Sequence, residues 1–297
     1  MNQISGVKKL TSHCCLLAEG PLWLAQSHEL LFVDIHNGKL LCSDEFGTLL
    51  QEFTFPEEVS AVVHCDQRYV VVASGCTLYY LDRSNGQYTA LLTVPGVSDN
   101  LRFNDGKVDP YGNLWIGTMD KAEIQPKACL YRITPELEVS VVLKGITVSN
   151  GLDWDIKKQC MYYVDSPSKS VMCYSIDFEN GTLSDAQLVY QLLQQEVFPD
   201  GLCIDSEGFI WLALWGGSSV IKIDPTTKQQ VQRLWLPTNK VTSCAFGGPN
   251  FSTLYITTAS ISEDKEVAIK NDAGAVYTYT PHIGGKAPTP FNLTKLP

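Results

Sequence analysis

The chain lacks several features that would place it in common classes of protein. None of its apolar runs approaches the roughly eighteen residues that a membrane-spanning helix needs. The first residues, MNQISGVKKLTSHCC, contain no continuous apolar core of the kind found in secretory signals. A formal net charge of −10 offers no positive surface to nucleic acid or to an anionic membrane. We therefore predict a cytoplasmic protein that binds neither nucleic acid nor membrane.

Paired cysteines are also missing. The ten cysteines are scattered along 297 residues without a C-x-x-C pair, and no Cys/His cluster has the spacing of a zinc site. Most lie in apolar runs, where a free cysteine packs as a small hydrophobe, so we expect reduced thiols rather than disulfides. The five histidines have no ligand or triad spacing, and neither a G-x-S-x-G nor an H-E-x-x-H motif occurs. Serine-hydrolase and zinc-protease chemistry are therefore disfavoured.

A repeated strand pattern is what the chain does contain. Hydrophobic residues make up 44% and charged residues 18% of the sequence, as in a folded globular protein. Six strand-like segments recur at intervals between 39 residues (Leu31 to Val70) and 49 residues (Met161 to Ile210). They cover residues 30–35, 69–74, 113–119, 160–166, 209–215 and 253–259. A period in the forties made of short strands and turns is typical of a β-propeller with one blade per repeat.

The two ends of the chain indicate how the ring of blades closes. The sixth repeat is short of an outer strand, and an irregular Pro- and Gly-rich tail follows at 281–297. Residues 7–17 are a strand candidate with no blade of their own, so we expect them to supply the missing outer strand and remove open sheet edges. The predicted fold is all-β: one six-bladed propeller domain over residues 1–297, closed by the N-terminal strand. Residues 189–195 are ambiguous between helix and strand, and charged residues 263–266 and 270–272 are expected to form a solvated loop.

One polar residue stands at the start of each expected innermost strand, about ten residues before the segment named above. In a propeller these starts point toward the central axis, so the six side chains should meet there. The positions are Glu19, Ser60, Asn104, Asn150, Asp200 and Ser243. Asn, Asp and Ser are also common turn residues at strand starts, and this explanation stays open for any single position.

As a set, the six positions favour a metal site. Carboxylates gathered on one axis need a counter-charge, because burying a charge without a partner is costly. With no His or Cys among them, the residues suit a hard cation bound through oxygen, such as Ca²⁺, Mg²⁺ or Mn²⁺. We expect Glu19, Asn150 and Asp200 to be the protein ligands, with water or substrate completing the shell.

Six motifs run along nearly the whole chain. They are AEGPLW (18–23), RFNDGKVDPYGNLWIGTM (102–119), SNGLDW (149–154), MYYVDS (161–166), PDGLCID (199–205) and TSCAFGGPNFSTLYITTA (242–259). In order and spacing the chain resembles the gluconolactonase / regucalcin / luciferin-regenerating enzyme family. The resemblance implies a six-bladed propeller with one divalent metal on its axis, held by Glu19 in AEGP, Asn150 in SNGL and Asp200 in PDGL. Ca²⁺ is the favoured ion, with Zn²⁺, Mn²⁺ and Mg²⁺ as alternatives.

The resemblance also implies roles in substrate binding and catalysis. Arg102 and Asn104 in RFND match the substrate-contacting pair of the family, and Asp200 matches the residue credited with the acid–base step. Relatives often carry a substrate-facing acidic residue a few positions after GTM. Here that run reads DKAE at 120–123, so either Asp120 or Glu123 would take this part.

These observations predict a metal-dependent lactonase, a carboxylic ester hydrolase that converts small-molecule sugar lactones to aldonic acids. The metal would act as a Lewis acid on the lactone carbonyl and Asp200 as the general base. We expect a monomer or a dimer. Two alternatives stay open: a calcium-binding regulatory protein of the regucalcin type, and a hydrolase of another ester, nitrile or phosphotriester on the same metal site.

Overall fold

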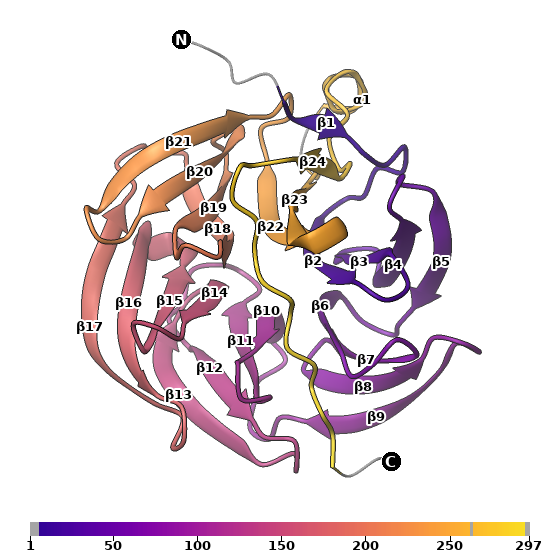
Figure 1. Ribbon diagram of the computed structural model, residues 1–297. Coiled ribbons are helices and arrows are strands. Elements are labelled where there is room, and N and C mark those ends of the chain that lie inside the picture. Colours follow the sequence, from indigo (N-terminus) through magenta and orange to yellow (C-terminus); the bar gives the residue numbers. More distant parts are fainter. Residues whose placement is uncertain (1–5, 262–263, 295–297) are drawn as a thin grey trace.

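The computed structural model describes residues 6–261 and 264–294, which form six four-stranded antiparallel sheets around a central axis (Figure 1). The six-bladed β-propeller predicted from the repeat is therefore confirmed. Its six predicted anchor segments are the second strands of the blades, with observed bounds that differ by at most one residue. Within the described residues, no helix is both long and apolar enough to cross a membrane.

The blades follow one another along the chain, and each is described here from the axis outward. Blade 1 consists of β2 (Ala18–Leu24), β3 (Glu29–Asp34), β4 (Lys39–Asp44) and β5 (Leu49–Thr54). Blade 2 consists of β6 (Val59–His64), β7 (Tyr69–Ser74), β8 (Thr77–Asp82) and β9 (Gln87–Thr93). Blade 3 consists of β10 (Leu101–Val108), β11 (Leu114–Asp120), β12 (Ala128–Ile133) and β13 (Val139–Ile146).

Blades 4 to 6 repeat this order. Blade 4 consists of β14 (Ser149–Asp155), β15 (Cys160–Asp165), β16 (Ser170–Asp177) and β17 (Thr182–Gln191). Blade 5 consists of β18 (Phe198–Ile204), β19 (Ile210–Trp215), β20 (Ser219–Asp224) and β21 (Gln229–Trp235). Blade 6 consists of β22 (Val241–Gly247), β23 (Thr253–Thr258), β24 (Tyr277–Tyr279) and β1 (Lys8–Lys9). Two short 3₁₀ segments, η1 (Ser166–Ser168) and η2 (Pro249–Phe251), and one α-helix, α1 (Lys265–Lys270), complete the described elements.

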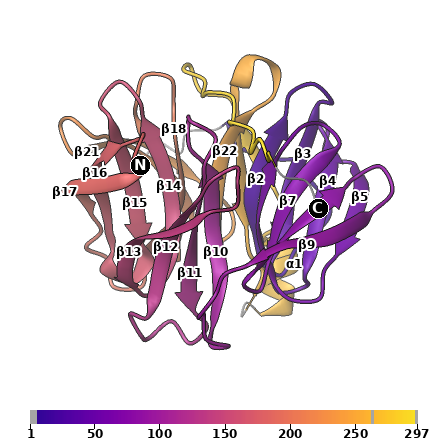
Figure 2. The same cartoon turned by 90° about the horizontal axis from the view of Figure 1, so that it is seen from below.

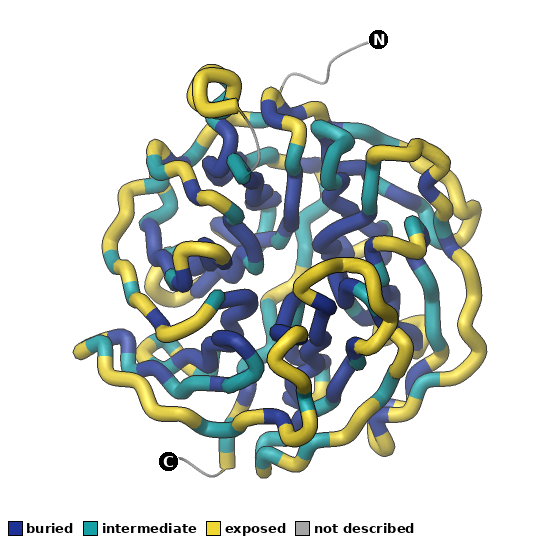
Figure 3. Tube along the Cα trace, turned by 180° about the vertical axis from the view of Figure 1, so that it is seen from behind, coloured by how far each residue is buried: buried dark blue, intermediate teal, exposed yellow. Residues whose placement is uncertain are grey.

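Burial decreases from the axis to the rim (Figure 3). The second strand β7, with the sequence YVVVAS, is buried at all positions but the first, whereas no residue of the outermost strand β9 is buried. Second strands pack against neighbouring blades on both faces, so they are apolar without strict alternation, and their β-branched residues suit the strand backbone. This continuous apolar character made these six segments visible in the sequence.

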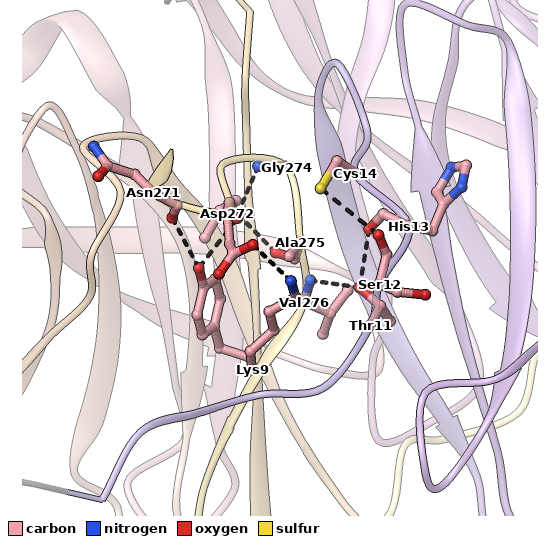
Figure 4. A network of polar contacts seen from close by, with 12 residues as sticks. Lys9, Thr11, Ser12, His13, Cys14, Asn271, Asp272, Gly274, Ala275 and Val276 are labelled. Carbon is pink, nitrogen blue, oxygen red and sulfur yellow. Dashed lines mark hydrogen bonds and ion pairs between the residues drawn. The ribbon is translucent and has the colours of Figure 1, made fainter. Parts of the chain in front are cut away.

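The N-terminal segment closes the ring. β1 pairs antiparallel with β24, with Lys8 opposite Thr278 and Lys9 opposite Tyr277. The regular strand is shorter than the expected residues 7–17, because after Lys9 the chain leaves the sheet and runs alongside residues 271–276 toward blade 1 (Figure 4). The Lys9 Nζ donates to the Asp272 Oδ1 at 2.6 Å in this contact, and Leu17 forms an isolated bridge with Ala259.

Two local predictions need correction or completion. The prediction of a solvated loop at 263–266 and 270–272 was wrong for the residues that belong to α1. Residue 263 lies outside the described residues. The Asp264 side chain caps α1 by accepting the N–H groups of Glu266 and Val267, and no residue of the helix is buried. A helix without an apolar stripe leaves no periodic pattern to read. The ambiguous residues 189–195 begin as strand, in β17, which pairs with β16 up to Gln191.

The C-terminal tail crosses one face of the propeller. Residues 281–294 contain no helix or strand, and residues 295–297 lie outside the described part. The Gly284 oxygen accepts the Ser206 N–H at 2.9 Å in blade 5, and the Phe291 N–H donates to the His64 oxygen at 2.8 Å in blade 2. The Phe291 side chain is fully buried in the apolar cluster of blades 2 and 3. In the side view the tail lies along one face and α1 projects from the opposite one (Figure 2).

Candidate functional site

Each innermost strand is irregular at one polar residue near its start. In all six blades the pairing between the innermost and the second strand shifts register near this residue. Such a shift is typical of a β-bulge, which redirects a side chain. These residues are all buried, with at most 8% of their surface exposed: Glu19, Ser60, Asn104, Asn150, Asp200 and Ser243. The six strands surround the axis, so the structure brings the predicted polar positions to one central region (Figure 1).

Glycines beside these residues allow the inner strands to approach closely. A Cβ atom on Gly151 would lie 2.6 Å from the Leu202 nitrogen, and one on Gly201 would lie 2.1 Å from the Ser243 Oγ. Neither distance leaves room for a side chain. Adjacent inner strands are therefore in contact beside Asn150 and Asp200, and the ring is narrow at the level of the polar residues.

The Asn150 side chain is oriented by a neighbouring serine. Its Nδ2 donates to the Ser166 Oγ at 3.1 Å, and that hydroxyl donates in turn to the Pro199 oxygen at 2.7 Å. The Asn150 Oδ1 is buried and has no hydrogen-bond partner. A buried amide oxygen without a partner is costly, and a bound cation would satisfy it.

Three acidic side chains at the axis, Glu19, Asp105 and Asp200, lie close enough for their charges to interact. Burial, followed by the charges of Asp200 and Asp105, raises the pKa of Glu19 well above its usual range. The pKa of Asp200 is raised for the same reasons, burial first and then the charge of Asp105, while a hydrogen bond from Asn150 acts in the opposite direction. Burial raises the pKa of Asp105 to about 6 against the opposing charge of Lys107. This donor set of oxygens and unbalanced negative charge fits a hard divalent cation held by Glu19, Asn150 and Asp200.

Arg102 is fixed beside this group. Its Nη1 donates to the Phe103 oxygen at 2.9 Å and to the Asn104 Oδ1 at 2.8 Å. The Asn104 Nδ2 donates to the Ser149 oxygen at 2.7 Å, so Asn104 links the guanidinium to blade 4. Burial lowers the pKa of Arg102, and the charges of Glu58, Glu123 and Glu19 oppose that effect. The Arg102 guanidinium therefore interacts electrostatically with Glu19, one of the proposed metal ligands.

The two acidic candidates after GTM differ in position. The Asp120 Oδ2 accepts the N–H groups of Ile124 at 3.0 Å and Gln125 at 2.8 Å, and these bonds hold the pKa of Asp120 below its usual range. Asp120 is buried and caps the loop that follows β11. Glu123 is exposed on that loop with a left-handed φ of 59°, and its charge acts on both Arg102 and Asp200. The charge of Glu123 therefore reaches the site, whereas Asp120 supports the loop that carries Glu123.

The sequence matches a known protein family over most of its length. Residues 17–260 match the SMP-30/Gluconolactonase/LRE-like region. The chain belongs to this family. It is 36% identical over 279 residues to a protein of Bacillus subtilis (strain 168) named sugar lactone lactonase YvrE, covering 93% of this chain and 95% of that one. It is 36% identical over 285 residues to human regucalcin, with 94% and 95% covered.

A solved structure gives the same fold. The calcium-binding protein regucalcin from Agrobacterium tumefaciens superposes with a TM-score of 0.90 at 24% identity, with 97% of each chain covered. At that identity the likeness shows the propeller fold alone.

In this member of the SMP-30/gluconolactonase family, Glu58 is a site residue that sequence reasoning missed. Its Oε2 lies 3.3 Å from the Arg102 Nε, and its Oε1 lies 2.6 Å from the His36 Nδ1. A signal was present, because Glu58 stands two residues before Ser60 just as Arg102 stands two residues before Asn104. Equivalent positions of neighbouring blades lie close together, so opposite charges there predict an ion pair. Ser166 had no such signal, since its contact with Asn150 depends on how η1 follows β15.

A cavity of about 180 Å³ lies on the axis between the polar residues and the C-terminal tail. Asp105, Lys107, Asp153 and Lys286 are among its lining residues. The Lys107 Nζ donates to the Asp153 Oδ2 at 3.0 Å and to the Leu202 oxygen at 3.1 Å, which joins blades 3, 4 and 5. The C-terminal tail covers the end of the axis next to this cavity. Substrate would therefore reach the polar residues from the opposite face, on which the inner strands begin.

Proposed function

We propose that the protein is a metal-dependent lactonase that hydrolyses sugar lactones to aldonic acids. The observation that carries the proposal is the buried group of Glu19, Asn150 and Asp200, in which the Asn150 Oδ1 has no partner. Arg102 and Glu123 beside this group provide the hydrogen-bonding side chains that a polyhydroxylated substrate requires. A relative that is 36% identical over nearly the whole chain is named as a sugar lactone lactonase, which supports the same substrate class.

Glu19, Asn150 and Asp200 would hold one divalent cation. Oxygen donors alone favour Ca²⁺, with Mg²⁺, Mn²⁺ and Zn²⁺ as alternatives. When bound, such a cation supplies Lewis-acid polarisation of a substrate carbonyl.

Asp200 is the proposed general base. Its carboxylate would accept a proton from the water whose oxygen attacks the lactone carbonyl carbon. The same proton would pass to the ring oxygen as the bond between that oxygen and the carbonyl carbon breaks, which leaves the open-chain hydroxy acid. Burial raises the basicity of the Asp200 carboxylate, and a bound cation would offset the raised pKa enough to keep the carboxylate ionised.

Arg102 and Glu123 are the proposed substrate-binding residues. The guanidinium can donate to lactone or sugar oxygens, and Glu123 can accept from sugar hydroxyls. Asn104 would act mainly by holding Arg102, because its Oδ1 accepts from Arg102 and its Nδ2 donates to Ser149. Asp120 would act through the loop that presents Glu123.

The second candidate is a calcium-binding regulatory protein without turnover, which the 36% identity to human regucalcin favours. Arg102→Met separates the two functions, because calcium binding alone does not need the guanidinium. Calcium binding would be measured by calorimetry, and glucono-δ-lactone hydrolysis by pH-stat, on the same preparation. The lactonase proposal expects both activities in the wild type and loss of turnover alone in Arg102→Met. Calcium binding without turnover on any sugar lactone would favour the regulatory protein and reject the lactonase.

A further inference from the structure

A second group of metal-binding side chains lies away from the axis. His13, Cys15 and Asp34 each offer one donor atom, and these atoms all lie within 4.8 Å of one another. Among the residues that the structure describes, no other group of three or more His, Cys, Asp or Glu side chains is this compact. The group forms where the N-terminal segment, having closed the ring through β1, reaches the end of β3 in blade 1.

The turn at the end of β3 requires only the carboxylate, although Cys15 also packs in a buried apolar cluster. The Asp34 Oδ1 accepts the Leu17 N–H at 3.1 Å, and Oδ2 accepts the Leu16 N–H at 3.3 Å. Asp165, at the end of β15 in blade 4, accepts two successive N–H groups of residues 147 and 148 in the same way. Asp165 belongs to no metal-binding group among the described residues. The imidazole and thiol next to Asp34 are therefore additions that this turn does not require.

Cys15 and Asp34 are held in place before any ligand binds. The Cys15 N–H donates to the Gly274 oxygen at 2.8 Å, and the Cys15 oxygen accepts from the Ser260 Oγ at 2.8 Å. The Asn37 Nδ2 donates to the Asp34 Oδ2 at 2.8 Å, as outer hydrogen bonds orient metal-ligating carboxylates. Cys15 and Asp34 have no exposed surface.

Entry is possible from the His13 side. His13 is only partly buried. Figure 4 shows its imidazole turned away from the ion pair that Lys9, on the same N-terminal segment, forms with Asp272. A cation could therefore reach the buried thiol and carboxylate past a side chain that lies near the surface.

One nitrogen, one sulfur and one oxygen donor form a set that zinc binds, whereas Ca²⁺ and Mg²⁺ bind oxygen donors. We propose that His13, Cys15 and Asp34 bind Zn²⁺, or a similar borderline transition metal, with water in the fourth position. The bound metal ties the N-terminal segment to blade 1 and so secures the closure of the ring. This site is separate from the axial oxygen site, and the proposal does not depend on lactonase activity.

Cobalt reports this site selectively. A sulfur ligand gives Co²⁺ a thiolate-to-metal charge-transfer band in the near ultraviolet, which the all-oxygen axial site cannot produce. Reduced, metal-stripped wild-type protein and Asp200→Ala are both expected to develop the band with one equivalent of Co²⁺. Zn²⁺ should then displace the cobalt and abolish the band. Absence of the band in both proteins would overturn the proposal.

Ligand variants assign the band to these residues. Cys15→Ser should abolish it, and Cys14→Ser, which changes an exposed neighbouring thiol, should leave it intact. Because Cys15→Ser alters a buried position, His13→Ala provides a second test at a partly exposed one. It should weaken cobalt binding at least tenfold and remove the Zn²⁺-induced rise in Tm that the wild type shows. A band that persists in both ligand variants would place the metal on other cysteines and reject the site.

Discussion

The Nε of Arg102 lies 3.3 Å from the Oε2 of Glu58, and the two residues occupy equivalent positions in neighbouring blades. Arg102 is 5% exposed, so its charge needs this partner more than a surface arginine would. The same glutamate lies 2.6 Å from the His36 Nδ1. Glu58 therefore links the proposed substrate-binding guanidinium of Arg102 to the partly exposed imidazole of His36.

Glu58→Gln should weaken substrate binding more than it slows turnover. The guanidinium loses its charged partner but keeps the bonds from Nη1 to Phe103 and Asn104. We expect KM for the lactone to rise about tenfold, equivalent to about 1.4 kcal/mol, with a smaller change in kcat. Steady-state kinetics would measure both constants. Glu57→Gln is the matched control, because Glu57 is the exposed neighbour, and equal kinetics in the two variants would contradict the positioning role.

Ser166→Ala should lower metal affinity at the axial site. The Ser166 hydroxyl holds the Asn150 amide, which is expected to present its Oδ1 to the cation. Loss of such an outer contact typically costs about tenfold or more in affinity. Calorimetric titration with Ca²⁺ would test this, with Ser168→Ala as the control, since the Ser168 hydroxyl bonds to Asp165 and Ser170 and not to Asn150. Unchanged affinity in Ser166→Ala would exclude Asn150 as an oriented ligand.

Metal-free protein should lose stability as the pH rises from about 4 to above 6. The pKa of Asp105 is raised from 3.8 to about 6, so the folded state binds this proton more tightly than the unfolded state does. The stabilising contribution of the neutral carboxyl is therefore complete below the unfolded pKa and lost as the pH passes through about 6. A shift of this size corresponds to at most about 3 kcal/mol.

Urea unfolding across this pH range would measure the effect. Asp105→Asn should show a smaller decline than the wild type, because the amide does not ionise. Saturating Ca²⁺ should also reduce the decline, since a cation compensates the charges of Glu19 and Asp200 near Asp105. Identical pH slopes in the wild type and Asp105→Asn would show that Asp105 does not carry this dependence.

Phe291→Ala should destabilise the protein while leaving the axial site intact. Its ring is fully buried between blades 2 and 3, on the face away from the inner strand starts. Removing a buried phenylalanine side chain typically costs about 3–5 kcal/mol. Urea unfolding should show this loss, whereas Asn292→Ala, which changes an exposed neighbour, should stay within about 0.5 kcal/mol of the wild type. Equal stability of the two variants would mean that the tail does not contribute to the fold.

The sequence predicted the propeller because its evidence is local and repeated. Each second strand is a run of apolar residues, and the period between runs defines a blade without any knowledge of distant contacts. The short β1 was harder to delimit, because only Lys8 and Lys9 pair with β24 before the chain turns away. The helix α1 was missed because none of its residues is buried.

The convergence of Glu19, Asn150 and Asp200 was also predictable, since equivalent positions of all blades meet at the axis. Contacts between non-equivalent positions were not. The sequence could not choose between Asp120 and Glu123, because the choice depends on the bonds from Asp120 to the N–H groups of the loop. The proximity of His13, Cys15 and Asp34 arises where the N-terminal segment returns to blade 1, and no spacing in the sequence reports it.

The most direct test of the central proposal is pH-stat hydrolysis of glucono-δ-lactone by metal-stripped protein, with Ca²⁺, Mg²⁺, Mn²⁺ or Zn²⁺ restored in turn. Asp200→Ala would be assayed beside the wild type, and Ser168→Ala would control for handling. We predict turnover that requires added metal, that Ser168→Ala retains and that Asp200→Ala lacks. Full turnover by the metal-free protein, or metal-restored turnover in Asp200→Ala, would contradict the proposed lactonase mechanism.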